Sequence, residues 1–129
     1  LGKMVFGNSE SLARLNQIMH PQMYKMVEAR IEEYRRQGVG VVVLEAPLLI
    51  EANWTSLVDE VWVVVASESA VLERIKERTG LPEQESLARI RSQLSSVERR
   101  KHADVVINND GNLDELKARV RELWQKLQV

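Results

Sequence analysis

The sequence predicts an α/β protein built around a parallel sheet with helices on both faces, which gives three layers. Two runs rich in valine, 41–44 and 61–65, are apolar throughout and lack the polar alternation of half-exposed strands. Continuous apolar runs are typical of strands that are buried on both faces. A third apolar run lies within 104–108, and segments with helical spacing separate the runs. Alternating strands and helices predict right-handed crossovers and therefore parallel strands.

The composition is that of a globular domain. Of the 129 residues 44% are apolar and 29% are charged, and the net charge is −1. So small a net charge produces no overall field that would recruit nucleic acid or an acidic membrane. The chain has no cysteine, which excludes disulfides and thiol nucleophiles and fits a cytoplasmic location. No apolar stretch reaches the roughly 18 residues that span a bilayer.

The start of the chain is unusual, because it begins with Leu1 and Gly2 rather than Met. Three strands are also few for a parallel sheet of this type. We therefore expect a fragment of a single domain whose first strands are missing.

Two helices are predicted before the first strand, separated near Pro21. Ser9 is expected to cap the first helix. Pro21 fits best at the first position of a second helix, from about 22 to 37, which Gly38 ends. The apolar residues with helical spacing are Leu12, Leu15, Ile18 and Met19 in the first helix, and Met23, Met26, Val27, Ile31 and Tyr34 in the second.

An acid, Glu45, follows the first strand directly, and Pro47 prevents the strand from continuing. Ligands of open parallel sheets bind at the carboxyl ends of the strands. Nucleotide-binding folds often place an acid there to organise Mg²⁺ and water, so Glu45 is a candidate for that role. The alternative is an acid that is simply exposed at the end of a strand. The spacing gives the next acid, Glu51, no clear task.

The helices after residue 66 are predicted from their caps and their apolar spacing. Ser67 is expected to cap a helix that runs to Arg78, Pro82 to open the next helix, and Asn112 to cap the last. The apolar faces contain Val71, Leu72 and Ile75 in the first of these helices, Leu87, Ile90 and Leu94 in the second, and Leu116, Val120, Leu123, Trp124 and Leu127 in the last.

Two arginines share one face of the helix that Ser67 caps. Arg74 and Arg78 are four residues apart, just before the Gly80–Pro82 junction. Guanidinium groups bind phosphate oxygens bidentately, so this pair suits a phosphate clamp beside a mobile junction. The alternative is pairing within the helix with Glu73 and Glu77.

The third strand leads into Asn108, Asn109, Asp110 and Gly111. One interpretation is a turn, because these residue types adopt left-handed backbone conformations easily. The other is that an asparagine amide at the end of the strand reads the edge of a base.

The residue sets that several classes of enzyme require are absent from this chain. No Ser/His/Asp or Cys/His set is present, and the phosphate-binding G-x-x-x-x-G-K-[ST] loop is absent. The two histidines are far apart and lack acidic partners at ligand spacing, so no histidine metal site is expected. His20, just before Pro21, is interpreted as a cap, a satisfied polar group or a ligand contact.

Six short motifs occur in the order VFGN, IMHP, PLLIE, ERIKERTGL, ARIRSQ and ADVVINNDG. In this order and spacing they resemble the dephospho-coenzyme A kinase family, and the resemblance covers essentially the whole chain. It implies a P-loop fold of the nucleoside-monophosphate-kinase type, here without its first strands and P-loop. It also implies ATP-dependent phosphorylation of the ribose 3′-hydroxyl of dephospho-coenzyme A, with Mg²⁺ bound together with ATP.

The resemblance assigns segments and residues. It implies acceptor-binding helices at 1–40, core strands at 41–68, a lid at 69–103, and the last strand and helix at 104–129. Glu45 stands where most members carry Asp and takes the catalytic, metal-organising role. The implied residues on the ATP side are Arg74, Arg78 and Gln93 for the lid, and Asn108, Asn109 and Gly111 near the adenine. Those on the acceptor side are His20, Pro21, Pro47, Leu48 and Glu51.

Two alternatives remain open from the sequence. One is another small P-loop kinase of a nucleotide or metabolite, against which IMHP and PLLIE argue. The other is a non-catalytic binding module without a P-loop. The expected partners are dephospho-coenzyme A and ATP, with neither nucleic acid nor a membrane. Without a P-loop, these 129 residues alone are expected neither to turn over nor to bind ATP well.

Overall fold

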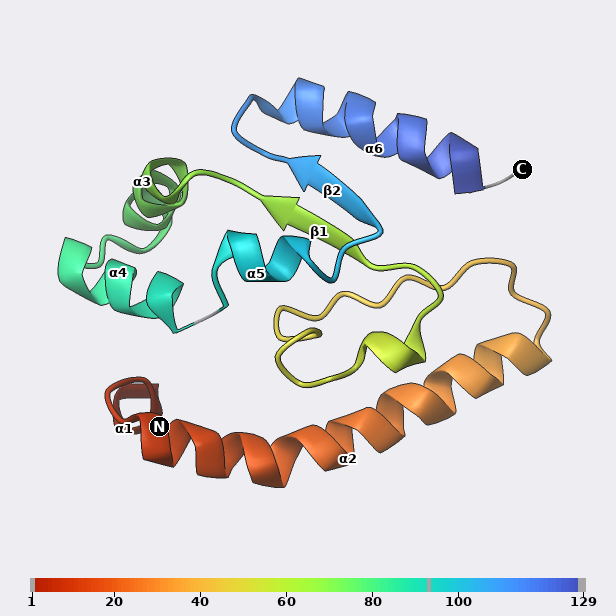
Figure 1. The fold of residues 1–129 in the computed structure, drawn as a ribbon, viewed down its shortest axis with the longest axis horizontal. Helices are drawn as coiled ribbons and strands as arrows, with labels where there is room; N and C mark the ends of the chain where they lie inside the picture. The colour runs from red at the N-terminus through yellow and green to blue at the C-terminus, as the bar shows by residue number, and fades with distance from the viewer. Residues whose placement is uncertain (1, 93, 128–129) are drawn as a thin grey trace. The chain divides into compact units, whose positions relative to one another are not determined.

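The computed structural model describes residues 2–92 and 94–127, and the chain divides into two compact units (Figure 1). The units are Leu1–Asp59 and Glu60–Val129. The first contains the helices α1 (Gly2–Phe6), α2 (Ser9–Arg36) and the short η1 (Thr55–Leu57). The second contains β1 (Trp62–Val65), α3 (Glu68–Thr79), α4 (Glu83–Arg91), α5 (Ser96–Arg100), β2 (Val105–Asn108) and α6 (Leu113–Leu127). Within these described ranges no helix is both long and apolar enough to cross a bilayer.

Helix α2 is continuous through Pro21, so the predicted break into two helices is wrong. Proline fixes φ at a helical value and removes one hydrogen-bond donor, which weakens a helix without always ending it. The predicted cap at Ser9 is also wrong. Asn8 caps the helix instead, since its Oδ1 accepts hydrogen bonds from the amides of Glu10 (3.0 Å) and Ser11 (3.1 Å). The predicted end is confirmed, with Gly38 in the left-handed region at φ 78°.

The segment 41–46 is irregular, so the predicted strand at 41–44 is wrong for this structure. A strand exists only while a neighbour completes its hydrogen-bond ladder. The sheet of the described residues contains β1 and β2 alone, and 41–44 pairs with neither. Val43 is accordingly 77% exposed, and Glu45 does not lie at the end of a strand.

Strands β1 and β2 confirm the predicted runs 61–65 and 104–108 and pair in parallel. Trp62 stands opposite Val105, and Val65 stands opposite Asn108. Figure 1 shows the two arrows pointing the same way, with α5 beside β1 and α6 beside β2. The buried apolar side chains of this unit are Val61, Val63, Val65, Ile107 and Leu123.

The predicted caps of the second unit are confirmed. Ser67 Oγ accepts a hydrogen bond from the Ala70 amide (3.2 Å), and α3 ends at Gly80 with φ 66°. Pro82 precedes α4. The Asn112 side chain accepts a hydrogen bond from the Glu115 amide (2.9 Å) in the first turn of α6. The short helix α5, which has only five residues, was not predicted.

Candidate functional site

Polar residues gather at the carboxyl ends of β1 and β2. The strands are parallel and Val65 is in register with Asn108, so both strands end at the same edge of the sheet. The Asn109 amide donates a hydrogen bond of 2.7 Å to the Val65 carbonyl, which ties the loop after β2 to the end of β1. This edge is where open parallel sheets bind their ligands. The structure thus brings two of the predicted adenine-loop residues, Asn108 and Asn109, to that edge.

Asp110 joins this loop to the start of α3. Its Oδ1 accepts a hydrogen bond of 2.7 Å from the amide of Ser67, the N-cap residue of α3. Within the loop, Asn108 Oδ1 accepts a hydrogen bond of 2.9 Å from the Asp110 amide. The bond from the Ser67 amide lowers the pKa of the Asp110 carboxyl; the Asn108 side chain and, more weakly, the Arg74 guanidinium act in the same direction, against a desolvation effect that raises it. The sequence predicts no functional role for Asp110.

The two arginines of α3 are exposed and share one face. Neither forms an ion pair with Glu73 or Glu77 among the salt bridges of the described residues. The structure therefore does not show the alternative, in which these arginines pair within the helix. The Arg74 guanidinium is the weakest of the groups that lower the pKa of the Asp110 carboxyl. The third predicted lid residue, Gln93, lies outside the described residues.

The loop 108–111 is not a left-handed turn. Asn53 is the non-glycine residue with positive φ in the described part of the chain, and the glycines with positive φ there are Gly38 and Gly80. The left-handed conformations expected of the turn are therefore absent, and the bend is held instead by the hydrogen bond from the Asp110 amide to Asn108 Oδ1 (2.9 Å). A Cβ on Gly111 would lie 1.8 Å from Glu115 Oε2, but that carboxylate is the end of a flexible side chain.

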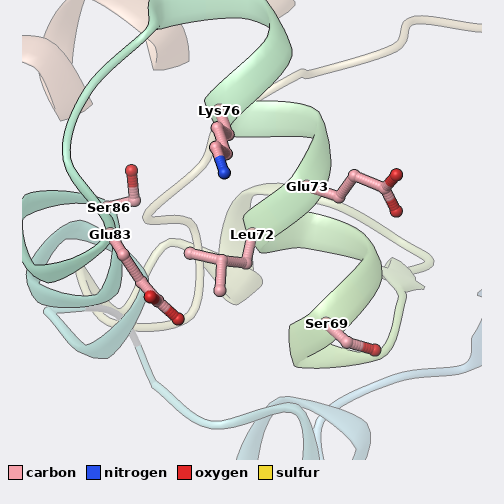
Figure 2. A pocket seen from close by; sticks show the side chains of 6 residues that line it. All are labelled: Ser69, Leu72, Glu73, Lys76, Glu83 and Ser86. Atoms are coloured by element: carbon pink, nitrogen blue, oxygen red, sulfur yellow. The ribbon is translucent and has the colours of Figure 1, made fainter.

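A separate cavity of about 260 Å³ lies between α3 and α4. Figure 2 shows Lys76 and Ser86 on either side of it, while the carboxylate of Glu73 points away. Ser86 is fully buried and its hydroxyl has no hydrogen-bond partner among the described residues. The lining residues of α3 occupy the face opposite Arg74, so this cavity is no part of the site at the strand ends.

In the first unit, the segment from Pro47 to Trp54 forms one helical turn that ends in a Schellman motif. The Ala52 amide donates to the Leu48 carbonyl (2.8 Å) and starts the turn. At its end, the amide of Trp54 donates to Leu49 (2.9 Å) and that of Asn53 to Ile50 (3.0 Å). Asn53 takes the left-handed conformation with φ 64°, which the motif requires at that position.

This turn places Trp54 against α2. Trp54 is 5% exposed, and its ring meets the rings of His20 (centroids 5.9 Å apart, 66° between planes) and Tyr24 (6.4 Å, 68°) edge to face. The contact joins the predicted acceptor residue His20 to the segment that carries Pro47, Leu48 and Glu51. Among the predicted acceptor residues, Pro21, Pro47 and Glu51 are exposed and Leu48 is half-buried. Trp54 and Tyr24 were not predicted from the sequence; the asparagine before the tryptophan was the available signal for a helix C-terminus.

Glu45 is exposed in the irregular segment, and no cluster of three or more His, Cys, Asp or Glu able to hold a metal ion occurs among the described residues. Mg²⁺ in phosphate-transfer sites is held by one or two carboxylates together with substrate phosphates and water. A lone carboxylate such as Glu45 therefore fits Mg²⁺ as a single ligand beside a bound polyphosphate and does not form a metal site by itself.

The parallel strands define an α/β protein with polar residues at the carboxyl ends of its strands, the edge at which open parallel sheets bind ligands. A sequence model of the family described as dephospho-CoA kinase matches residues 1–115. The chain belongs to the dephospho-CoA kinase family.

Curated relatives and solved structures agree with this assignment. The chain is 43% identical over 123 residues to the dephospho-CoA kinase of Dehalococcoides mccartyi, covering 95% of this chain and 62% of that protein. It is 45% identical over 126 residues to that of Carboxydothermus hydrogenoformans, covering 98% and 61%. The chain thus spans about three fifths of the length of these curated relatives.

The fold is similar to that of TT1252 from Thermus thermophilus, with a TM-score of 0.74 and 32% identity over 98% of this chain and 64% of that one. A dephospho-CoA kinase from Campylobacter jejuni has the same fold, with a TM-score of 0.65, 24% identity, and coverage of 98% and 62%. The predicted family and the predicted α/β class of P-loop kinase type are confirmed.

Proposed function

We propose that the full-length protein transfers the γ-phosphoryl group of ATP to the ribose 3′-hydroxyl of dephospho-coenzyme A, the last step of coenzyme A biosynthesis, in the cytoplasm. The observation that carries this proposal is the family match over residues 1–115. Because the chain spans 62% and 61% of the named relatives, the activity is proposed for the full-length protein.

On the ATP side, Arg74 and Arg78 bind phosphate oxygens. Phosphoryl transfer depends on positioning and on stabilising charge at the transferred group, which guanidinium groups supply bidentately. Their exposure and their lack of ion pairs with Glu73 or Glu77 support this role. The loop residues Asn108, Asn109 and Gly111 contact the adenine, and Gln93 takes part from the lid.

On the acceptor side, dephospho-coenzyme A binds along α2 and the segment after Pro47. His20 and Pro21 on α2, and Pro47, Leu48 and Glu51 in the turn, contribute to its binding. The edge-to-face contact between Trp54 and His20 supports this grouping, because it holds α2 and the turn together. Mg²⁺ bound with ATP neutralises charge on the phosphates, and Glu45 contributes one carboxylate toward it.

A coupled assay of ADP release tests the proposal in the full-length protein. We expect ADP release that depends on dephospho-coenzyme A, and a coenzyme A product phosphorylated at the 3′-position. Preference for a different nucleotide or metabolite acceptor would identify another small kinase. Binding of dephospho-coenzyme A without ADP release would identify a non-catalytic module. Either of these outcomes refutes the proposed reaction.

A further inference from the structure

We propose that Asp110 is a positioning residue, which fixes the loop 108–111 to the start of α3 and so sets where Arg74 presents its charge. This inference rests on the proposed function. No contact with either substrate is proposed for Asp110, which acts through Ser67 and Arg74.

The geometry makes Asp110 the junction between the two strand ends. The loop after β1 ends at Ser67, whose amide donates to Asp110 Oδ1 at 2.7 Å. The loop after β2 is held by the 2.7 Å bond from the Asn109 amide to the Val65 carbonyl and by the 2.9 Å bond from the Asp110 amide to Asn108 Oδ1. A single carboxylate therefore links the proposed adenine loop to the helix that carries the proposed phosphate clamp.

The position of Arg74 on α3 extends this link. Arg74 follows Ser67 by seven residues, which is about two turns and returns to the same face of the helix. Side chains in a helix tilt toward its N-terminus, so Arg74 leans back over the turns that Ser67 begins. The electrostatic action of Arg74 on Asp110 agrees with this direction.

A carboxylate at Asp110 also suits the N-terminus of α3 electrostatically. The first amides of a helix have no partner within the helix, and the N-terminus of the helix favours negative charge. Asp110 satisfies the Ser67 amide at this end with a charged acceptor. Asparagine at 110 would keep an oxygen acceptor and lose the charge, whereas alanine would lose both, so the two variants separate the hydrogen bond from the charge.

The test compares Asp110→Ala and Asp110→Asn with Asp114→Asn in the full-length protein. Asp114 is the matched control, because it is an exposed acid in the first turn of another helix, α6. For Asp110→Ala we expect kcat to fall and KM for ATP to rise, with kcat/KM for ATP about 10- to 100-fold lower, as for loss of a hydrogen bond to a charged group. KM for dephospho-coenzyme A should stay unchanged. The kcat/KM for ATP of Asp110→Asn should lie between those of wild type and Asp110→Ala, and that of Asp114→Asn should match wild type.

A merely structural role would lower the melting temperature without this split between the two substrates. The inference is wrong if folded Asp110→Ala keeps kcat/KM for ATP within about twofold of wild type, or if it weakens both substrates equally. Hydrogen exchange at the Ser67 amide gives a readout that needs no turnover: it should be faster in Asp110→Ala and unchanged in Asp114→Asn. Wild-type protein without kinase activity would refute the proposed function instead, while slow exchange at Ser67 in Asp110→Ala would refute the link itself.

Discussion

Truncating Trp54 to alanine should detach the turn 47–54 from α2. Trp54 is 5% exposed, and Val5 is the other buried apolar residue among the described positions of the first unit. Trp54 is therefore the large buried side chain among those of this unit whose burial the structure describes. Removing a buried tryptophan costs about 3–5 kcal/mol, which includes the cavity left behind. The edge-to-face pairs with His20 and Tyr24 are part of that loss, at about 0.5–1.5 kcal/mol each.

The effect should be local, and hydrogen exchange measured by mass spectrometry resolves it by segment. A loss of this size predicts amide exchange about 10²- to 10⁴-fold faster in the middle of α2 and in the turn 47–54. Trp54→Phe keeps one aromatic ring and should lose about half as much stability or less. Trp124→Ala is the control, because Trp124 is 39% exposed on α6 and belongs to the second unit. It should leave exchange in α2 unchanged.

If His20 and the turn bind dephospho-coenzyme A together, Trp54→Ala should also raise KM for this acceptor and leave KM for ATP unchanged. The reasoning is refuted if exchange in α2 and in the turn stays within about threefold of wild type in Trp54→Ala. In that case Trp54 would be buried without holding the two segments together.

Four further predictions concern single residues and the chain as a whole. Arg78→Ala should lower kcat about 10²-fold or more in the full-length protein, whereas Lys76→Ala, which removes a cation from the same last turn of α3, should not; equal losses would point to the helix dipole instead. Asn53→Ala should lower the free energy of unfolding by about 1 kcal/mol, because alanine disfavours the left-handed conformation, while Asn53→Gly should be neutral in the same urea titration. The lowered pKa of Asp110 means that its stabilisation is present above about pH 4 and is lost as the pH falls through the lower folded-state pKa, so the melting temperatures of wild type and Asp110→Asn should converge in acid; a constant difference would contradict this. Residues 1–129 alone, which contain no P-loop motif, should show no ADP release in the coupled assay, and turnover at the full-length rate would refute this.

Local signals predicted much of the second unit. The runs 61–65 and 104–108 became strands because each finds the other as a ladder partner within the unit. Ser67 and Gly80 mark the ends of α3 through contacts with residues three and four positions away. Contacts between residues so close in the chain can be predicted from a short stretch of sequence. The run 41–44 has equal strand propensity but no partner in the sheet of the described residues, so the same propensity leaves it irregular.

The residues that the sequence analysis missed share one property, which is that their contacts join positions distant in the chain. Asp110 and Ser67 are 43 residues apart, and Trp54 meets His20 from a different element. At the sequence level, the NDG stretch around Asp110 and the NW pair at Trp54 fit ordinary turns and helix ends. Only the parallel register of β1 and β2, which sets the ends of both strands at one edge, gives the Asp110 carboxylate an amide to accept from. Asn108 lies at the end of β2 and Arg74 and Arg78 lie on α3, whereas Glu45 follows no strand. The side chains that hold the loop and the helix in place follow from tertiary pairing.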